Sequence, residues 1–386
     1  MANYIRYNDK MAFHPGAYID DFIKSYGLTQ KDFSARLGTT PKNLCTLIQG
    51  EQRLSQDMAQ KLACVTNIST QTWQNLQNSY DKALLIVKEQ EQKEREKKVI
   101  SDISYSSLSS LYSLPDLKRK TDEQIPETKH SLGISDLEEL KRVPSSTCLR
   151  HSKDMTEANI VRANVMILFA TNAAIKTETA PFNRQKLDRA VESALTKTTD
   201  YEGMYEAMQE EFRKAGVAFF VLPNIPGSKL NGAVKKLRRK AVLLVSDRNR
   251  TVDTLFFTLL HEIAHIKNND WGPYFEEDEG EAEERADRYA EDMLIPPEKY
   301  SAFFISRSYD RESIVSFAWE INRDPGIVVA RLQKDGVVRY DDKELNSLKH
   351  ACSIKQDTSI CLRPFDVDIS EALKRGQTGP SRELCR

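Results

Sequence analysis

The most regular hydrophobic pattern lies in the first 85 residues, where five short segments repeat apolar residues at helical spacing. Each begins at a residue that favours a helix start, and the first three end at a glycine: Pro15 to Gly27, Thr29 to Gly38, Thr40 to Gly50, then starts at Ser55 and at Ser69 or Thr70. Two short helices joined by a glycine-containing turn, inside such a bundle, form the helix-turn-helix arrangement. We therefore expect an all-α domain over residues 1–87.

The third of these helices is the one expected to enter the major groove of DNA. Side chains able to contact bases or phosphates lie on its outer face or near helix starts: Gln30, Thr40, Lys42, Asn43, Thr46, Gln49 and Arg53. Charge adds little, because the whole chain has 56 Lys and Arg against 57 Asp and Glu. A helical bundle that binds protein has a similar pattern, so that alternative stays open.

The apolar period is lost between residues 88 and about 150. The segment 88–98 is almost entirely Lys, Glu, Gln and Arg, residues 104–113 are rich in serine, and Pro115, Pro126 and Pro144 interrupt the remainder. We interpret 88–150 as a charged and Ser/Pro-containing linker. Helical spacing returns over 151–215, which predicts a helical platform.

Two continuous apolar runs, at 216–222 and 240–246, are typical of buried strands. They predict a small sheet directly before a helix over about 251–267. The outer edge of such a sheet can pair with an extended peptide, although an ordinary packed sheet has the same pattern. No apolar run approaches the ~18 residues that cross a bilayer, so we expect no membrane partner.

The helix over 251–267 contains a motif with chemical meaning, His261-Glu262-Ile263-Ala264-His265. Residues four apart leave one helix face, so His261 and His265 can bind one ion, with Glu262 beside them as a base. Zinc held by two histidines and a carboxylate keeps a position for water and lowers the pKa of that water to about 7. A solvated helix face can carry this pattern by chance. The apolar residues around it favour a buried pair that needs partners.

A third ligand is expected from the amphipathic helix that comes after an acidic loop. Glu283 is the candidate ligand, with Glu281 or Glu284 as alternatives in register. Asp287, one turn later, is expected to accept the second N–H of a ligating histidine. A solvated acidic face explains the same residues without a metal. In the loop, Tyr274 is a candidate for stabilising a tetrahedral oxyanion, although an aromatic residue there more often only packs.

Part of the N-terminal region resembles the HigA-type antitoxins of the Xre helix-turn-helix family. The matching stretches are Phe13-His14-Pro15-Gly16, Leu28-Thr29-Gln30, Leu44-Cys45-Thr46-Leu47-Ile48-Gln49-Gly50 and Met58-Ala59-Gln60-Lys61-Leu62-Ala63. The resemblance implies that the domain binds operator DNA as a dimer and represses its own promoter.

Residues 216–340 are similar to the ImmA/IrrE metallopeptidases, in the branch with an N-terminal Xre domain. The matching stretches are Asn231-Gly232-Ala233, Phe256-Phe257-Thr258, the histidine motif, Glu283 to Ala290, Leu294-Ile295-Pro296-Pro297 and Pro325 to Gln333. The resemblance implies His261, His265 and Glu283 as ligands of one Zn²⁺ or another divalent metal, and Glu262 as general base. It also implies cleavage of a repressor or similar DNA-binding protein. The family usually has glycine where this chain has Ala264.

The sequence therefore predicts an α+β chain of five parts. These are a helix-turn-helix domain (1–87), the linker (88–150), the helical platform (151–215), a zincin-like metallopeptidase domain (216–340) and a polar tail (341–386). Six scattered cysteines without C-x-x-C spacing, and no signal segment at the start, predict a reducing cytoplasm.

The leading functional hypothesis is a DNA-binding transcription regulator fused to a zinc-dependent endopeptidase. It would cleave a repressor or other regulatory protein in a stress, phage or toxin-antitoxin context. The alternative is an antitoxin-like regulator whose peptidase-like half is a sensor or partner-binding module without proteolysis. Expected partners are operator DNA and a protein substrate, with a toxin and a second copy of the chain as further candidates.

Overall fold

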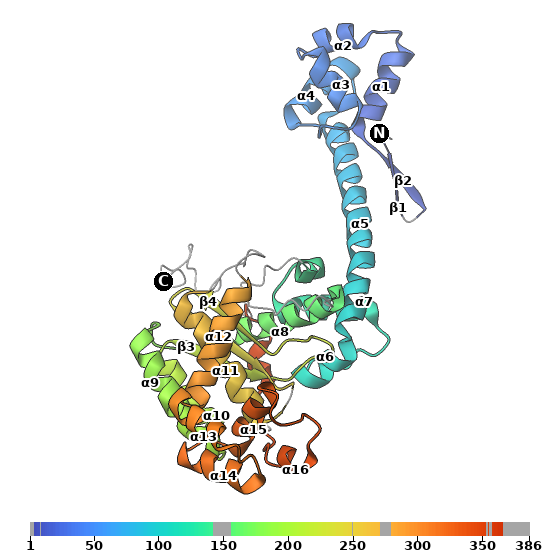
Figure 1. Ribbon diagram of the computed structural model, residues 1–386. Coiled ribbons are helices and arrows are strands. Elements are labelled where there is room, and N and C mark those ends of the chain that lie inside the picture. Colours follow the sequence, from blue (N-terminus) through green and yellow to red (C-terminus); the bar gives the residue numbers. More distant parts are fainter. Residues whose placement is uncertain are drawn as a thin grey trace, which may run out of the picture. The chain divides into compact units, whose positions relative to one another are not determined.

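The computed structural model describes residues 4–7, 9–141, 156–248, 250–270, 279–352, 354 and 357–365. The chain divides into two compact units, Met1–Arg95 and Glu96–Arg386. Helices dominate both units, and each also contains one small sheet (Figure 1). The chain is thus a helix-rich α+β protein with an N-terminal bundle of short helices.

The first unit is a helical bundle preceded by a hairpin. Its elements are β1 (Tyr4–Tyr7), β2 (Lys10–Phe13), α1 (Pro15–Ser25), α2 (Gln30–Arg36), α3 (Pro41–Ile48), α4 (Gln56–Thr66) and the first part of α5 (Thr70–Ile103). The predicted helix starts are confirmed, because Thr29, Thr40 and Ser55 each accept a hydrogen bond from the backbone N–H three residues later. The hairpin was not predicted, because its four-residue strands are too short to show a periodic pattern.

Helix α5 continues through the charged segment 88–98 and ends only at Ile103. Lys, Glu, Gln and Arg favour helices intrinsically, so this segment forms one without an apolar period. The division between the two units falls inside this helix. Beyond it, Val99, Ile100 and Ile103 are buried in a core of the second unit.

The structure differs from the expected linker over residues 96–141. Helices α6 (Tyr105–Tyr112) and α7 (Thr121–Leu132) and the 3₁₀ helix η1 (Leu137–Lys141) all contribute to that core. In the serine-rich segment, Tyr105, Leu108 and Tyr112 recur at helical spacing and are buried, a period that the serines between them obscured. The predicted linker residues 142–150 lie outside the described residues.

The second unit is built on a three-stranded sheet of order β3 (Val217–Leu222), β5 (Lys240–Ser246), β4 (Gly232–Leu237). β3 and β5 are parallel and occupy the two predicted apolar runs, while β4 pairs antiparallel with β5. β4 was not predicted, because Lys235 and Lys236 interrupt its apolar residues. Its position makes it an edge strand of this sheet.

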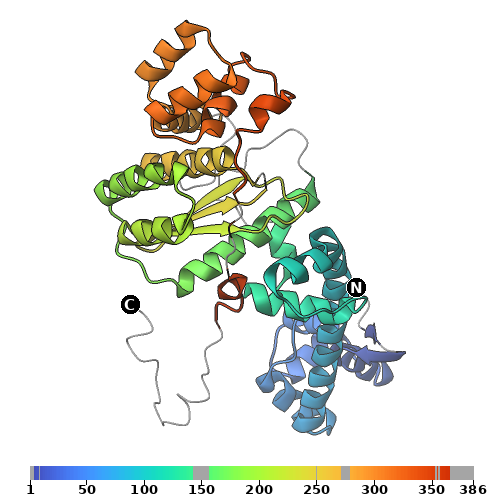
Figure 2. The same ribbon diagram turned by 90° about the horizontal axis from the view of Figure 1, so that it is seen from below.

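Helices cover both faces of the sheet (Figure 2). Alternate residues of β3 belong to different cores: Ala218, Phe220 and Leu222 pack in the core that contains α8 (Glu157–Lys176). Val217, Phe219 and Val221 pack in the other core, with residues of α9 (Arg184–Leu195), α10 (Met204–Lys214) and α11 (Val252–Asn268). Burial on both faces explains the continuous apolar runs of β3 and β5.

Helix α8 is long and apolar enough to cross a membrane by length and composition, although its sequence was not predicted to do so. In the fold, 72% of its most apolar window is buried inside the protein. Core helices of soluble proteins commonly have this combination.

The C-terminal part is helical. Its elements are α12 (Glu279–Leu294), α13 (Pro297–Ser306), α14 (Arg311–Glu320), α15 (Pro325–Lys334), α16 (Lys343–Asn346) and η3 (Thr358–Cys361). The described part of the predicted polar tail is attached to the start of α11. The N–H of Val252 donates to the carbonyl of His350 (3.0 Å), and Lys349 forms an ion pair with Asp253 (3.3 Å). Residues 366–386 lie outside the described part.

Candidate functional site

Helix α11 carries the histidine motif between the sheet and helix α12. Phe256, Leu259 and Ile263 of α11 are buried in the hydrophobic core beside the sheet. His261 and His265 are also buried, with exposed fractions of 6% and 0%. An imidazole that is this deeply buried needs polar partners, and those partners come from α12.

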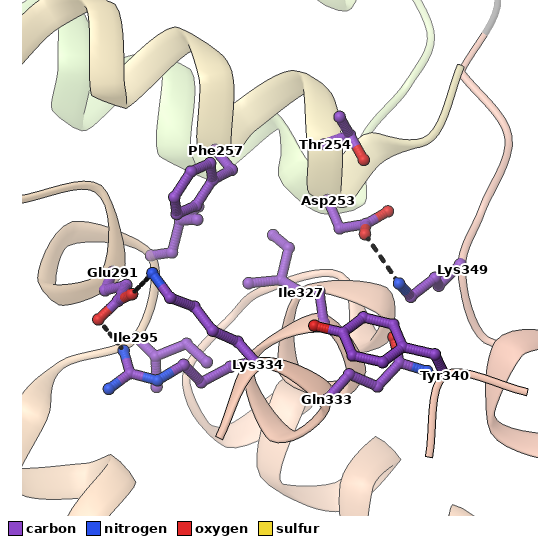
Figure 3. Close-up of a pocket in the computed structure, with 13 residues that line it drawn as sticks. Asp253, Thr254, Phe257, Glu291, Ile295, Ile327, Gln333, Lys334, Tyr340 and Lys349 are labelled. Carbon is purple, nitrogen blue, oxygen red and sulfur yellow. Dashed lines mark hydrogen bonds and ion pairs between the residues drawn. The ribbon is translucent and has the colours of Figure 1, made fainter. Parts of the chain in front are cut away.

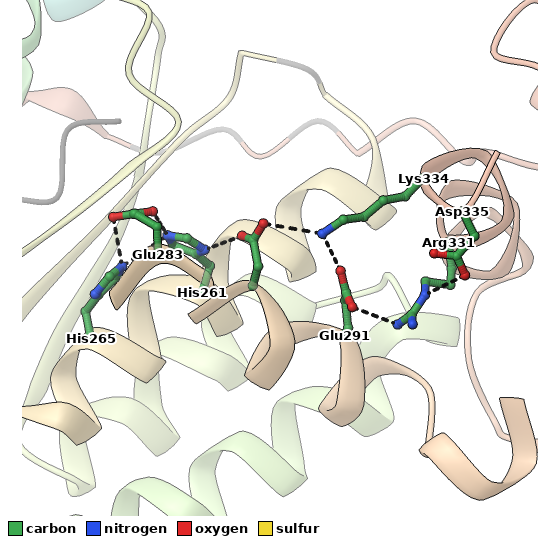
Figure 4. A network of polar contacts seen from close by, with 8 residues as sticks. His261, His265, Glu283, Glu291, Arg331, Lys334 and Asp335 are labelled. Carbon is green, nitrogen blue, oxygen red and sulfur yellow. Dashed lines mark hydrogen bonds and ion pairs between the residues drawn. The ribbon is translucent and has the colours of Figure 1, made fainter. Parts of the chain in front are cut away.

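The two imidazoles and Glu283 of α12 converge on one point (Figure 4). Nε2 of His261 lies 3.1 Å from Nε2 of His265, and the Glu283 carboxylate oxygens lie 3.0 Å and 3.5 Å from these two nitrogens. A tetrahedral metal with bonds of about 2.0–2.2 Å holds its ligand atoms about 3.3–3.6 Å apart. The donor types and spacing therefore fit zinc or a similar divalent ion. Glu283 occupies this position, and Glu281 and Glu284 are exposed.

Asp287 orients His261 from the other side of the ring. Nδ1 of His261 lies 2.9 Å from the Asp287 carboxylate, which accepts its N–H. When the imidazole is neutral, this bond leaves the lone pair on Nε2, toward Glu283 and His265. The other Asp287 oxygen pairs with Lys334 of α15 at 3.3 Å, and Lys334 also pairs with Glu291 (Figure 4). Asp287 was predicted in this position. Glu291, one turn further along α12, was not singled out, although it continues the spacing of Glu283 and Asp287. Lys334 was not predicted, because it approaches Asp287 only through the packing of α15.

The carboxylates around His261 change its proton affinity. Burial opposes the charged form, but the bonds to Asp287 and Glu283 and the charge of Glu262 outweigh it and raise the pKa of His261 to about 9. For His265, burial and the neighbouring charge of His261 lower the pKa. Without a metal, a proton on His261 thus holds the carboxylates together.

The candidate base Glu262 is buried against the start of β4. Its exposed fraction is 3%. A Cβ atom added to Gly232 would lie 2.7 Å from Cγ and Oε1 of Glu262 and 2.8 Å from the methyl group of Thr258. Only glycine therefore allows the edge strand to approach the base this closely. Ala264, which precedes His265, is also buried in α11.

The predicted DNA-contacting residues lie on or near α3 of the first unit. Lys42 and Gln49 are exposed, as are Gln30, Thr40 and Arg53. Asn43 and Thr46 are half-buried: the Asn43 amide donates to Thr39, and the Thr46 hydroxyl donates to the Asn43 carbonyl. Arg53 already pairs with Asp81 at 2.6 Å. Tyr274, the oxyanion candidate, lies outside the described residues.

Comparison with known proteins identifies the first unit. Residues 20–73 match the helix-turn-helix family. The uncharacterized HTH-type transcriptional regulator YddM of Escherichia coli K12 is 33% identical over 76 residues, which are 19% of this chain and 81% of that protein. The chain belongs to the helix-turn-helix family of DNA-binding transcriptional regulators.

A solved structure from Nostoc punctiforme, described as a candidate antidote protein of a plasmid maintenance system, is 24% identical with a TM-score of 0.22. The likeness covers 22% of this helix-turn-helix regulator and 92% of the antidote protein. The helix-turn-helix match ends at residue 73, before the residues that form the candidate metal centre.

Replacing Gly232 tests the contact between β4 and Glu262. Gly232→Ala should force the strand and Glu262 apart and lower the free energy of unfolding by about 1–3 kcal/mol, as overpacking usually does. Gly280→Ala is the control, because an added Cβ there meets nothing within 4 Å. Urea denaturation of the full chain measures both, and equal stability of the two variants would contradict the close contact.

The raised pKa of His261 predicts a pH dependence of metal binding. An unfolded-state histidine titrates near 6.5, so the stabilising contribution of this proton is complete below pH 6.5 and is lost as pH rises through about 9. A metal must displace the proton, so the affinity for zinc should increase over the same interval. Calorimetric titration with zinc in buffers of different ionisation enthalpy should show more proton release at pH 7 than at pH 9. Equal release at both would rule out a protonated His261.

Proposed function

We propose that this helix-turn-helix regulator is also a zinc-dependent endopeptidase. The observation that carries the proposal is that ligand atoms of His261, His265 and Glu283 lie close enough together to bind one metal ion. Glu262 lies on α11, the helix that carries both histidines. Two imidazoles and one carboxylate are the ligand set of many catalytic zinc sites, which keep one coordination position for water or substrate. The two packed helices that carry these ligands, beside a small sheet, are consistent with the predicted zincin-like domain over residues 216–340.

In this proposal the metal ion, Glu262 and Asp287 have different roles. Bound zinc would polarise the scissile carbonyl and make a water molecule more acidic. Glu262 would accept the proton of that water and pass it to the leaving amine. Asp287 would keep His261 in the tautomer and orientation that a ligand needs.

The edge strand β4 would position the substrate. β4 begins at Gly232, in contact with Glu262, and no strand among the described residues pairs with its outer side. An extended peptide that adds to this edge is held by main-chain hydrogen bonds and lies along the strand beside the base. Such a mode of binding requires an extended or locally unfolded segment in the target.

The helix-turn-helix unit indicates the kind of target. A peptidase attached to an operator-binding domain meets the other regulators bound nearby, so a DNA-binding repressor in the cytoplasm is the proposed substrate. A toxin encoded beside the gene is a second candidate partner. The alternative function is regulation without proteolysis, with the second unit as a sensor or partner-binding module. The helix-turn-helix match over residues 20–73 is sufficient for the DNA-binding part of this function.

Glu262→Gln separates catalysis from metal binding. The variant should retain bound zinc, because Glu262 is not among the three converging ligands. Its rate of cleavage of a repressor encoded beside the chain's own gene should fall at least about 100-fold. Glu284→Gln, an exposed glutamate of α12, is the matched control and should cleave normally. Metal analysis and gel-based cleavage assays measure both. If Glu262→Gln cleaves as well as the wild type, the proposed mechanism is wrong. If neither the wild type nor Glu262→Gln cleaves while DNA binding persists, the result favours regulation without proteolysis.

Substitution of Lys42 tests DNA binding by the first unit separately from cleavage. Removal of its charge in Lys42→Ala should weaken binding to the chain's own promoter and reduce the slope of log affinity against log salt by about one. Lys61→Ala is the control, because Lys61 lies on α4 and pairs with Asp57 at 2.8 Å. Fluorescence anisotropy over a series of salt concentrations measures the slope. An unchanged slope in Lys42→Ala would place α3 away from the phosphates.

A further inference from the structure

A cavity of about 260 Å³ lies between the first half of α11, the end of α12 and helix α15 (Figure 3). Asp253 and Phe257, two turns and one turn before His261, line it from α11. Tyr340 and Lys349 line it from the segment after α15. The volume is close to the lower end of pockets that bind small molecules, about 300–1,000 Å³.

The wall of this cavity is largely apolar and contains two aromatic rings. Ile295 and Ile327 contribute aliphatic surface, and Phe257 and Tyr340 contribute the rings. In Figure 3 the Ile327 side chain lies between Phe257 on one side and Tyr340 with Lys349 on the other. An apolar cavity with aromatic walls favours a flat, largely uncharged molecule.

Two residues that line the cavity each carry a buried acceptor atom without a hydrogen-bond partner in the described part of the chain: Asp253 Oδ1 and Gln333 Oε1. Their residues have exposed fractions of 5% and 2%. The other Asp253 oxygen pairs with Lys349, and the Gln333 amide nitrogen donates to the Arg339 carbonyl (3.2 Å) and to Asn346 (2.9 Å). The orientation of the Gln333 amide is therefore fixed, with its oxygen available as an acceptor. Buried acceptors without donors are costly, and a ligand with N–H groups would satisfy them.

The charges around the cavity nearly cancel. Lys349 is paired with Asp253, and Lys334 and Arg331 are both paired with Glu291. A strongly charged ligand would have to break one of these pairs. A neutral ligand would leave them all in place.

We propose that this cavity is a binding site for a small neutral aromatic heterocycle with N–H donors, of the size of a nucleobase. Its ring would lie among Phe257, Ile327 and Tyr340, and its N–H groups would donate to Asp253 and Gln333. The site is separate from the candidate metal centre and does not depend on zinc or on proteolysis. Lys334 nevertheless lines the cavity and pairs with Asp287, so an occupant would lie one ion pair away from the residue that orients His261.

Ligand binding to the full-length, metal-free chain tests this site. Adenine, hypoxanthine, cytosine and uracil are titrated separately by calorimetry, and at least one should bind with one-to-one stoichiometry. Ala330→Phe places a ring in the cavity and should weaken that binding at least tenfold. Ala302→Phe, the same change on the exposed side of α13, should leave it unchanged.

Gln333→Met removes the acceptor while keeping the side-chain length, and should weaken binding about tenfold. Circular dichroism confirms that each variant is folded. The proposal is overturned if none of the four bases binds at millimolar concentration, or if Ala330→Phe and Ala302→Phe bind equally well. It is also overturned if Ala330→Phe weakens binding of a peptide substrate while no base binds, since the cavity would then be a substrate pocket.

Discussion

The candidate site depends on the burial of two imidazoles beside carboxylates. His261 and His265 are almost completely inaccessible to solvent, and neither can remain there without polar partners. Glu283 and Asp287 provide them from one face of α12, one turn apart. The position of α12 on α11 therefore rests on these polar contacts together with the apolar packing of Ala282, Ala286 and Ala290. Either a proton or a metal ion has to compensate the carboxylates at this point, which makes the site sensitive to both.

The sheet gives this arrangement a rigid support. Its strands are buried on both faces, so α11 packs on a surface that cannot shift without disturbing the core on the other side. The close approach at Gly232 then places an edge of the same sheet against Glu262. The candidate base, the candidate ligands and the sheet edge thus belong to one packed unit. Positioning within fractions of an ångström is what a catalytic constellation requires.

Sequence patterns predicted the features that depend on spacing within one helix or strand. They did not predict contacts between segments that are distant in the sequence. The spacing of His261 and His265 predicted their shared face, and the spacing of Glu283 and Asp287 predicted their place beside the imidazoles. Nothing near the motif indicated Lys334, because it approaches Asp287 only through tertiary packing of α15. The prediction of a linker over 88–150 was wrong for residues 96–141, because serines and prolines obscured an apolar period that is buried in the structure. The strand β4 was missed for a similar reason, since its second half carries two lysines.

The ion pairs that extend from His261 connect the candidate metal centre to the rest of its unit. Asp287 and Glu291 of α12 alternate with Lys334 and Arg331 of α15 in a row of ion pairs. Figure 4 shows the last three of these residues. In such a row each charge is compensated by its neighbours, so displacement of one member leaves the next uncompensated. Lys334 belongs both to this row and to the wall of the cavity between α11, α12 and α15. A change in the cavity that moves Lys334 must therefore alter the compensation of Asp287, and with it the hydrogen bond that holds His261.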